Sequence, residues 1–396
     1  MKAYGKSIGR RYEEKEDITI DDDFLNDYSK ILQSKAYRRL AYKTQVICLP
    51  DNPHVRTRLS HTNEVVVFSI DIAKQLGLNE NLCMAIAAGH DIGHTPYGHV
   101  GERILSKLSG KPFKHNINSV VVAQHVERKG EGMNLTYETH DGILNHSRGD
   151  GKLSKTVDKP EEYDVVMNGD KIAYIFSDLN DALRYGHLDE SKIPECALKL
   201  GKNQRERVRN CLKSLVSESK EKGVVEFSEG PEFKNFSELK DFMYNEVYYK
   251  INTSLQEKTL ENLYDYFSTS EDFSGIDPVI SVSLLTDAEA NFFGQLLLKS
   301  RKPSAEQIKH FGIFEIQYAI GSGLVGKHVE VNTDATQVAV KIIREHGRLE
   351  YPKVSILPNP DYVKYVITMY ETAKKAIKNY RKLKNLESDR KLLVPY

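Results

Sequence analysis

RTRLSHTNEVVVFSIDIAKQLGLNENLCMAIAAGHDIGHTPYGHVGE, residues 56–102, is the stretch that decides the fold of this chain. Apolar side chains recur in it with the period of a buried helix over residues 62–76, and residues 81–89 are expected to form a second, more apolar helix. Gly77 should end the first helix, because glycine readily takes the left-handed conformation found after helix C-termini. The stretch therefore predicts two buried helices joined by a short antiparallel connection.

The polar residues of this stretch are of the types that bind a metal ion. His61 lies before the first helix and the adjacent pair His90 and Asp91 follows the second, while Asp170, in a later helical stretch, could close the site. A lone histidine before a helix is more often a cap or a surface group, and His-Asp adjacency is common by chance. Two imidazoles and two carboxylates together, however, suit a catalytic first-row divalent cation: Mn²⁺, Fe²⁺ or Ni²⁺, with Mg²⁺, Zn²⁺ and Co²⁺ as alternatives.

The rest of the chain also has mainly the 3.6-residue period, which predicts an all-α, mostly helical fold with at most minor strands. Asp170, Tyr174 and Asp178 are spaced by four residues and share one helix face. Residues 224–227 fit either a strand or a loop. Further helices are expected at residues 21–33, 116–128, 163–184, 286–301 and 362–385 and several between 200 and 270, a loop at 129–139, and minor strands at 329–331 and 352–357.

Composition limits the classes of function. The 396 residues carry a formal net charge of zero, so no basic excess marks nucleic acid as the main partner; the N-terminal basic residues and the Arg38-Arg39 pair are only modest hints. The N-terminus lacks the apolar core of a signal peptide, and no apolar run is long enough to span a membrane. The cysteines form no CxxC pair, which favours buried or free thiols in a reducing cytoplasm: Cys48, Cys83, Cys196 and Cys211.

Several motifs occur together in one order: KTQV, HVRTRLSHTNEV, HDIGHTPYGHVGE, FKHNINSVVV, NLTYETHDGILNH and GDKIAYIFSDLNDALRYG. With the order H…HD…D, they resemble the HD-domain superfamily and, more narrowly, the deoxyguanosine triphosphate triphosphohydrolase (dNTPase) family. The resemblance covers about residues 34–187. It implies an N-terminal lead-in (residues 1–33), a helical HD-domain catalytic core (34–190) and a mainly helical C-terminal region packed on that core (191–396).

The resemblance implies a role for each polar residue of these motifs. His61, His90, Asp91 and Asp170 bind the metal, with Mn²⁺ the first expectation. Asp178 is a rival for Asp170, but the family's ligand precedes isoleucine by two residues, which is Asp170 here.

His99 and Glu102 are three residues apart at the start of a predicted helix, so their side chains can hydrogen-bond, although such pairs are also common on surfaces. The family uses the pair as a catalytic dyad in which the histidine serves the departing oxygen. His94 and His115 resemble positions that face the α-phosphate.

The resemblance also implies the substrate contacts. Arg58 and Lys171 look like triphosphate contacts, Tyr174 and Asp178 would meet the deoxyribose, and Gln45 resembles a position near the sugar or base. Ordinary solvated charge and core packing are the alternatives for these residue types.

The expected activity is therefore the metal-dependent cleavage of a deoxynucleoside 5′-triphosphate, dGTP or several dNTPs, to deoxynucleoside and tripolyphosphate. Two alternatives remain open: another HD phosphohydrolase, such as a 5′-nucleotidase or phosphodiesterase, and a non-catalytic regulator that binds nucleotide or nucleic acid. The resemblance further implies a cytoplasmic homo-oligomer, a hexamer or tetramer, with single-stranded nucleic acid as a secondary ligand and no membrane partner.

Overall fold

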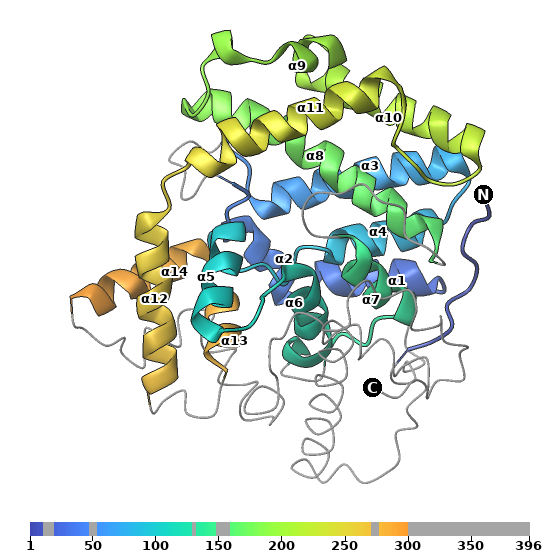
Figure 1. Ribbon diagram of the computed structural model, residues 1–396. Coiled ribbons are helices and arrows are strands. Elements are labelled where there is room, and N and C mark those ends of the chain that lie inside the picture. The colour runs from blue at the N-terminus through green and yellow to red at the C-terminus, as the bar shows by residue number, and fades with distance from the viewer. Residues whose placement is uncertain (11–19, 47–53, 129–131, 148–158, 271–276, 300–396) are drawn as a thin grey trace, which may run out of the picture.

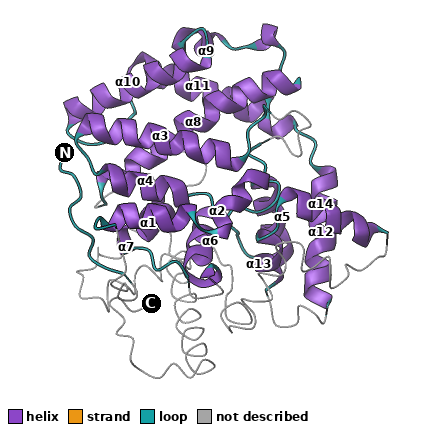
Figure 2. Ribbon diagram, turned by 180° about the vertical axis from the view of Figure 1, so that it is seen from behind, coloured by secondary structure: helices purple, strands orange, loops and turns teal. Residues whose placement is uncertain are grey.

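The computed structural model describes residues 1–10, 20–46, 54–128, 132–147, 159–270 and 277–299, and in these residues the chain is helical with two isolated β-bridges (Figures 1 and 2). The all-α prediction is thus confirmed. The helices are α1 (Asp23–Leu32), α2 (Lys35–Arg39), η1 (Leu40–Tyr42), α3 (Arg58–Leu76), α4 (Glu80–Gly89), α5 (His99–Ser109), α6 (His115–Val121), a π-helical turn η2 (Val122–Val126), α7 (Tyr137–Asn145), α8 (Glu161–Tyr185), η4 (Glu190–Lys192), α9 (Glu195–Leu200), α10 (Gln204–Lys222), α11 (Gly230–Glu246), η5 (Tyr248–Lys250), α12 (Ser254–Thr269), α13 (Pro278–Ser283) and α14 (Asp287–Leu298).

Helices α3 and α4 form the antiparallel hairpin that residues 56–102 predict. Gly77 follows α3 in the left-handed conformation with φ 68°, and Asn79 caps α4 by accepting a hydrogen bond from the Leu82 amide. Most of α4 is buried, because α3, α1, α7 and α8 all pack against it. The hairpin therefore stands at the centre of the core and fixes the position of the chain that follows α4.

Helix α8 crosses this hairpin and carries the last polar motif. It packs on α3, α4 and α10, and Gly186 ends it with φ 78°. In Figure 1, α9, α10 and α11 form one layer, α3 and α8 the next, and α4 with α1 and α7 the third. Helices α5, α12, α13 and α14 lie together at one end of these layers (Figure 1). The Asp170 face of α8 is thus directed toward the α3–α4 hairpin.

The turn after α4 is held against α6. The Gly93 amide donates to Ser119 Oγ at 2.9 Å, Ser119 Oγ donates to the His90 carbonyl at 2.8 Å, and Asn118 Nδ2 donates to the Gly93 carbonyl at 2.7 Å. A Cβ at Gly93 would overlap the backbone of Ser119, so only glycine permits this approach. The hydrogen bonds fix the path of the chain between the two predicted histidine groups.

Helices α13 and α14 fasten the same turn from the other side. Asp287, at the start of α14, accepts hydrogen bonds from the Thr44 amide and the Tyr97 amide, both at 3.0 Å. Buried Lys43 donates to the Ser283 carbonyl at 2.8 Å and also to the His94 carbonyl. The turn is therefore held in position by a residue far away in the sequence, since Asp287 and Tyr97 are 190 positions apart.

The structure corrects several predicted boundaries. Helix α3 begins at Arg58 rather than at residue 62, because Thr57 and Ser60 form a capping box there, and His61 consequently lies within the first helical turn. Helix α7 begins at Tyr137, capped by Thr136, so the predicted loop over residues 129–139 is too long. The region predicted as one helix over 116–128 is α6 followed by a π-helical turn.

The structure tests some of the remaining sequence predictions, and others concern residues that it does not describe. Residues 224–227 form a loop whose Val225 and Phe227 side chains enter the core. Cys83, Cys196 and Cys211 are buried free thiols, as expected. None of the helices in the described part of the chain combines the length and apolar character that crossing a membrane requires. The predicted strands at 329–331 and 352–357, the helix at 362–385 and Cys48 lie outside the described residues.

Candidate metal centre and the neighbouring histidine cluster

Four side chains from three separate segments meet at the α3–α4–α8 junction. His61, in the first turn of α3, places Nε2 3.0 Å from Asp170 Oδ1 of α8. His90, which follows the last residue of α4, places Nε2 3.4 Å from Asp91 Oδ2 and 3.8 Å from Asp170 Oδ1. We call His61, His90, Asp91 and Asp170 the metal group. The structure thus brings together the four residues that the sequence suggested as ligands.

The donor atoms of the metal group fit a divalent cation. His61 Nδ1 and His90 Nε2 are buried without a hydrogen-bond partner, although buried polar atoms in proteins normally have one. His90 Nδ1 lies 2.6 Å from the Ala87 carbonyl and must donate to it, which leaves Nε2 as the nitrogen that would bind a cation once it loses its proton. One ligand atom each from His61, His90 and Asp170 lies within 4.8 Å of the others. These nitrogen and oxygen donors are those of first-row divalent metals.

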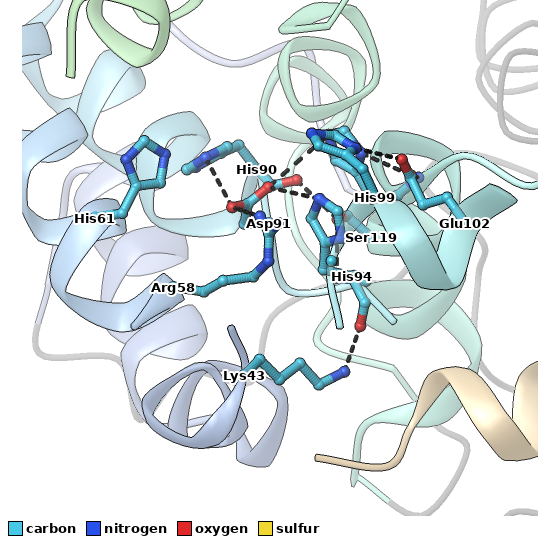
Figure 3. Close-up of polar contacts among 12 residues, drawn as sticks. Lys43, Arg58, His61, His90, Asp91, His94, His99, Glu102 and Ser119 are labelled. Atoms are coloured by element: carbon cyan, nitrogen blue, oxygen red, sulfur yellow. Dashed lines mark hydrogen bonds and ion pairs between the residues drawn. The ribbon is translucent and has the colours of Figure 1, made fainter. Parts of the chain in front are cut away.

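Asp91 is shared between the metal group and a second set of histidines (Figure 3). Its Oδ2 accepts a hydrogen bond from Arg58 Nη1 at 2.6 Å, and its Oδ1 lies 3.8 Å from both His94 Nε2 and His115 Nε2. Burial alone would raise the pKa of Asp91, but the positive charges of His90 and Arg58 outweigh it and hold the pKa well below its usual range. Asp91 is therefore an ionised carboxylate surrounded by cationic and imidazole groups.

The second set, which we call the His94 cluster, consists of His94, His99, Glu102 and His115. Glu102 Oε2 lies 2.6 Å from His99 Nδ1, and Glu102 Oε1 lies 2.8 Å from His115 Nδ1 and 2.5 Å from the His115 amide nitrogen. The His94 ring stacks on the His115 ring with centroids 4.1 Å apart. Glu102 is thus the shared acceptor of two imidazoles, one of which, His99, leaves 71% of its side chain exposed.

The charges of the His94 cluster follow from these contacts. Burial would raise the pKa of Glu102, but His115 and His99 lower it well below its usual range, so the carboxylate is ionised. Loss of hydration would lower the pKa of His99, yet the Glu102 carboxylate raises it overall. Burial and the charges of Arg58 and His115 hold the pKa of His94 well below its usual range, so its imidazole is neutral. In this cluster His99 therefore holds its proton more strongly than an ordinary histidine, whereas His94 is neutral.

The predicted phosphate contacts are placed close to the metal group. Arg58 is almost fully buried, and besides its bond to Asp91 it donates from Nη2 to the Gln45 carbonyl at 3.3 Å. Gln45 Oε1 is buried without a hydrogen-bond partner. Lys171 is buried next to Asp170 in α8. In this structure the Arg58 guanidinium therefore faces the Asp91 carboxylate.

The predicted sugar contacts lie further along α8. Asp178 Oδ2 accepts a hydrogen bond from the Tyr248 hydroxyl at 2.8 Å, and Tyr174 is half-buried against the core. Burial raises the pKa of Asp178 to about 7, against the opposing effect of the Tyr248 hydrogen bond. A recess opens beside Asp178, and its lining combines apolar side chains with one ion pair: Val46, Val55, Arg56, Asp178, Asp181, Ala182 and Val247.

Two residues of the site were not singled out from the sequence. His146 is buried, its Nε2 lies 3.2 Å from His115 Nε2, and its ring makes an edge contact with His90 at 5.0 Å. It ends the NLTYETHDGILNH motif, so the motif contained a signal for it. Tyr248 lies after α11 in a region without a recognised motif, and nothing in the sequence indicated its contact with Asp178.

A family model for the HD domain matches residues 58–175, the range that contains the metal group and the His94 cluster. The helical core and its histidine and aspartate groups thus define an HD-domain phosphohydrolase with a candidate His/Asp metal site.

The chain is also similar to curated proteins named deoxyguanosinetriphosphate triphosphohydrolase-like protein. The one from Caldanaerobacter subterraneus subsp. tengcongensis is 40% identical over 272 residues, which are 67% of this chain and 78% of that protein. The one from Desulfatibacillum aliphaticivorans is 39% identical over 67% of this chain and 79% of that protein. The one from Clostridium tetani is 41% identical over 61% of this chain and 70% of that protein. This chain belongs to the deoxyguanosinetriphosphate triphosphohydrolase-like family.

Proposed function

We propose that this chain hydrolyses deoxynucleoside 5′-triphosphates, dGTP or several dNTPs, to deoxynucleoside and tripolyphosphate. The observation that carries the proposal is the position of Asp91, which lies between His90 of the candidate cation site and His115. His115 in turn is hydrogen-bonded to Glu102 of the histidine–glutamate pair that is suited to proton transfer. The names of the similar proteins support the choice of substrate class.

The metal group is proposed to hold one divalent cation, with Mn²⁺ the first expectation. When bound, such a cation polarises a phosphate oxygen and activates water as a nucleophile. His61, His90, Asp91 and Asp170 supply two nitrogens and two carboxylates for it, and the carbonyl of Ala87 fixes the ring of His90 in the required tautomer.

His99 and Glu102 are proposed to handle the proton of the leaving group. Because Glu102 accepts from His99 Nδ1, a protonated His99 presents Nε2 for donation to the departing 5′-oxygen. Glu102 then acts through His99 as a positioning residue and stabilises its positive charge. His94 and His115, on the side of Asp91 that faces this pair, are proposed to face the α-phosphate.

The remaining predicted residues are proposed to bind the two ends of the substrate. Arg58 and Lys171 would offset charge on the triphosphate, and Gln45 would lie near the sugar or base. Tyr174 and Asp178 would meet the deoxyribose, since Asp178 lies at a recess with apolar side chains and one ion pair in its lining.

Three further expectations belong to the same proposal and rest on the resemblance: a cytoplasmic hexamer or tetramer, single-stranded nucleic acid as a secondary ligand, and a catalytic core over residues 34–190 between the lead-in 1–33 and the C-terminal region 191–396. Sedimentation of the full chain measures the first of these.

The deciding experiment incubates the full chain with each dNTP and each NTP in the presence of Mn²⁺ or Mg²⁺ and identifies the products by chromatography. Deoxynucleoside with tripolyphosphate supports the proposal. Orthophosphate from a nucleoside monophosphate would instead identify another HD phosphohydrolase, and tight nucleotide binding without turnover would identify a regulator.

Two variants separate the proposed roles. Asp91→Ala should lose both the cation of the metal group and turnover, whereas His99→Ala should keep that cation and lose turnover. Circular dichroism controls for folding. Full activity of His99→Ala would show that the pair with Glu102 is not used in the reaction.

A further inference from the structure

We propose that His94, His99, Glu102 and His115 form a second cation site, separate from the metal group and suited to Zn²⁺. The four side chains come from the turn after α4, the first turn of α5 and the first residue of α6. One ligand atom from each lies within 4.8 Å of all the others. The metal group, by contrast, draws on α3, α8 and the end of α4.

An independent observation at His94 points to a missing ligand. His94 is 1% exposed, and neither of its ring nitrogens has a hydrogen-bond partner. A buried imidazole normally satisfies at least one nitrogen, because leaving a buried polar group unpaired destabilises the fold. Its Nε2 lies 3.8 Å from Asp91 Oδ1, beyond hydrogen-bond distance, and its ring stacks on that of His115, so a cation bound beside these groups would satisfy it.

The donor set identifies the class of ion. Three imidazoles and one carboxylate are typical ligands of Zn²⁺, whereas Mg²⁺ and Ca²⁺ prefer sites made mainly of oxygen. Tetrahedral Zn²⁺ places its ligand atoms about 3.3 Å apart, which follows from bonds of about 2.0–2.1 Å. The present donor atoms lie within 4.8 Å of one another, so the side chains would have to rotate toward the ion when it binds.

The surroundings of the His94 cluster provide both charge and access. Glu102 lies between His99 and His115, and the cation would take the place of a proton that now lies between a carboxylate oxygen and an imidazole. Asp91 adds a second negative charge 3.8 Å from His94 Nε2 and from His115 Nε2. His99 is exposed and so gives a cation access from solvent, whereas His94 and His115 are buried.

One consequence rests on the proposed function. A cation held by His99 and Glu102 removes the pair that would protonate the leaving oxygen, so Zn²⁺ beyond the equivalent held by the metal group should inhibit dNTP hydrolysis. The site itself does not depend on that reaction, because ion binding is measured without substrate.

The test measures the Zn²⁺ content of the metal-free full chain after equilibrium dialysis against Zn²⁺, by mass spectrometry. Wild-type protein should bind two equivalents, and His94→Ala and His99→Ala should each bind one. His61→Ala should also bind one, held by the His94 cluster. His187→Ala, which removes an exposed histidine outside both groups, should still bind two.

Two results would overturn the second site: a single equivalent in wild-type protein that His61→Ala abolishes, or two equivalents retained by both His94→Ala and His99→Ala. Because His94 is buried, the exposed His99 variant keeps the test valid if His94→Ala unfolds. Co²⁺ gives a second readout, since the absorption band of a four-coordinate ion should disappear in His99→Ala and persist in His61→Ala. Two bound equivalents without inhibition of dNTP hydrolysis would refute only the role of the His99–Glu102 pair.

Discussion

Arg58→Met should destabilise the metal-free protein strongly, because it breaks a buried ion pair at the centre of the site. The guanidinium donates to Asp91 Oδ2 at 2.6 Å, and the two side chains are only 2% and 4% exposed. Methionine keeps most of the apolar stem but removes the charge. Asp91 would then remain buried without the partner that makes its shortest hydrogen bond, and the Gln45 carbonyl would lose its donor.

The expected loss in the free energy of unfolding can be bounded from the contacts that survive. Removing one member of a buried pair usually costs about 3–5 kcal/mol, since the other charge stays buried. Asp91 keeps the His90 imidazole at 3.4 Å. Although burial lowers the pKa of His90, Asp91 raises it overall to about 9, so this imidazole remains positively charged at neutral pH. The loss should therefore lie near the lower end, at about 3 kcal/mol.

The assay is urea unfolding followed by circular dichroism in the presence of a chelator, for Arg58→Met, Asp91→Asn and the double variant. The double variant should lose less than the sum of the single losses, by about 1–3 kcal/mol, because the pair interacts directly. Arg103→Met is the matched control: its ion pair with Glu257 is as short, at 2.7 Å, but Arg103 is 61% exposed, so the loss should stay below about 1 kcal/mol. A loss of similar size for Arg58→Met would refute the reasoning and leave Arg58 as a phosphate contact only.

Two more predictions concern single carboxylates. Asp178→Asn should remove a pH dependence of stability: burial raises the pKa of Asp178 from 3.8 to about 7, so between these values the folded chain binds a proton that the unfolded chain has released. This contribution to wild-type stability should therefore be fully present below the unfolded pKa and should fall by up to about 4 kcal/mol as pH rises through this window. Thermal unfolding of the variant at several pH values should not show this decrease. Parallel plots of stability against pH for the two proteins would contradict the assignment. Glu102→Gln should lower dNTP turnover by about 10²–10⁴-fold while the metal group keeps its cation, and calorimetric loss of that cation would show that Glu102 acts elsewhere.

The positions of the main helices could be predicted because each has a local cause. Gly77 ends α3 in the left-handed conformation predicted from the sequence, and Gly186 ends α8 in the same conformation. The start of α3 was missed by four residues, although Thr57 and Ser60 contain the capping signal. That error matters for the site, because His61 projects from a helical turn toward α8 rather than from a flexible approach to the helix.

The residue types of the candidate site could also be predicted, but several of their partners could not. The contacts of Tyr248 with Asp178 and of Lys43 with Ser283 join positions 70 and 240 residues apart. No periodicity or local motif encodes such distances, since they depend on how α11, α13 and α14 pack on the core. His146 is different: it lies in a motif, and only its contact with His115 required the structure.

The contacts of Arg58 show that a sequence motif can identify the residues of a site without indicating which of them pair with each other. Arg58 and His61 are three residues apart in α3 and therefore project toward the same region, whatever they bind. Asp91, however, is one carboxylate with several cationic or imidazole neighbours: Arg58, His90, His94 and His115. Without a bound cation, the guanidinium makes the shortest contact, a charge-assisted hydrogen bond of 2.6 Å, whereas His90 Nε2 lies 3.4 Å away. Helix geometry thus fixes which groups converge, whereas the balance of charge around Asp91 decides which of them pair.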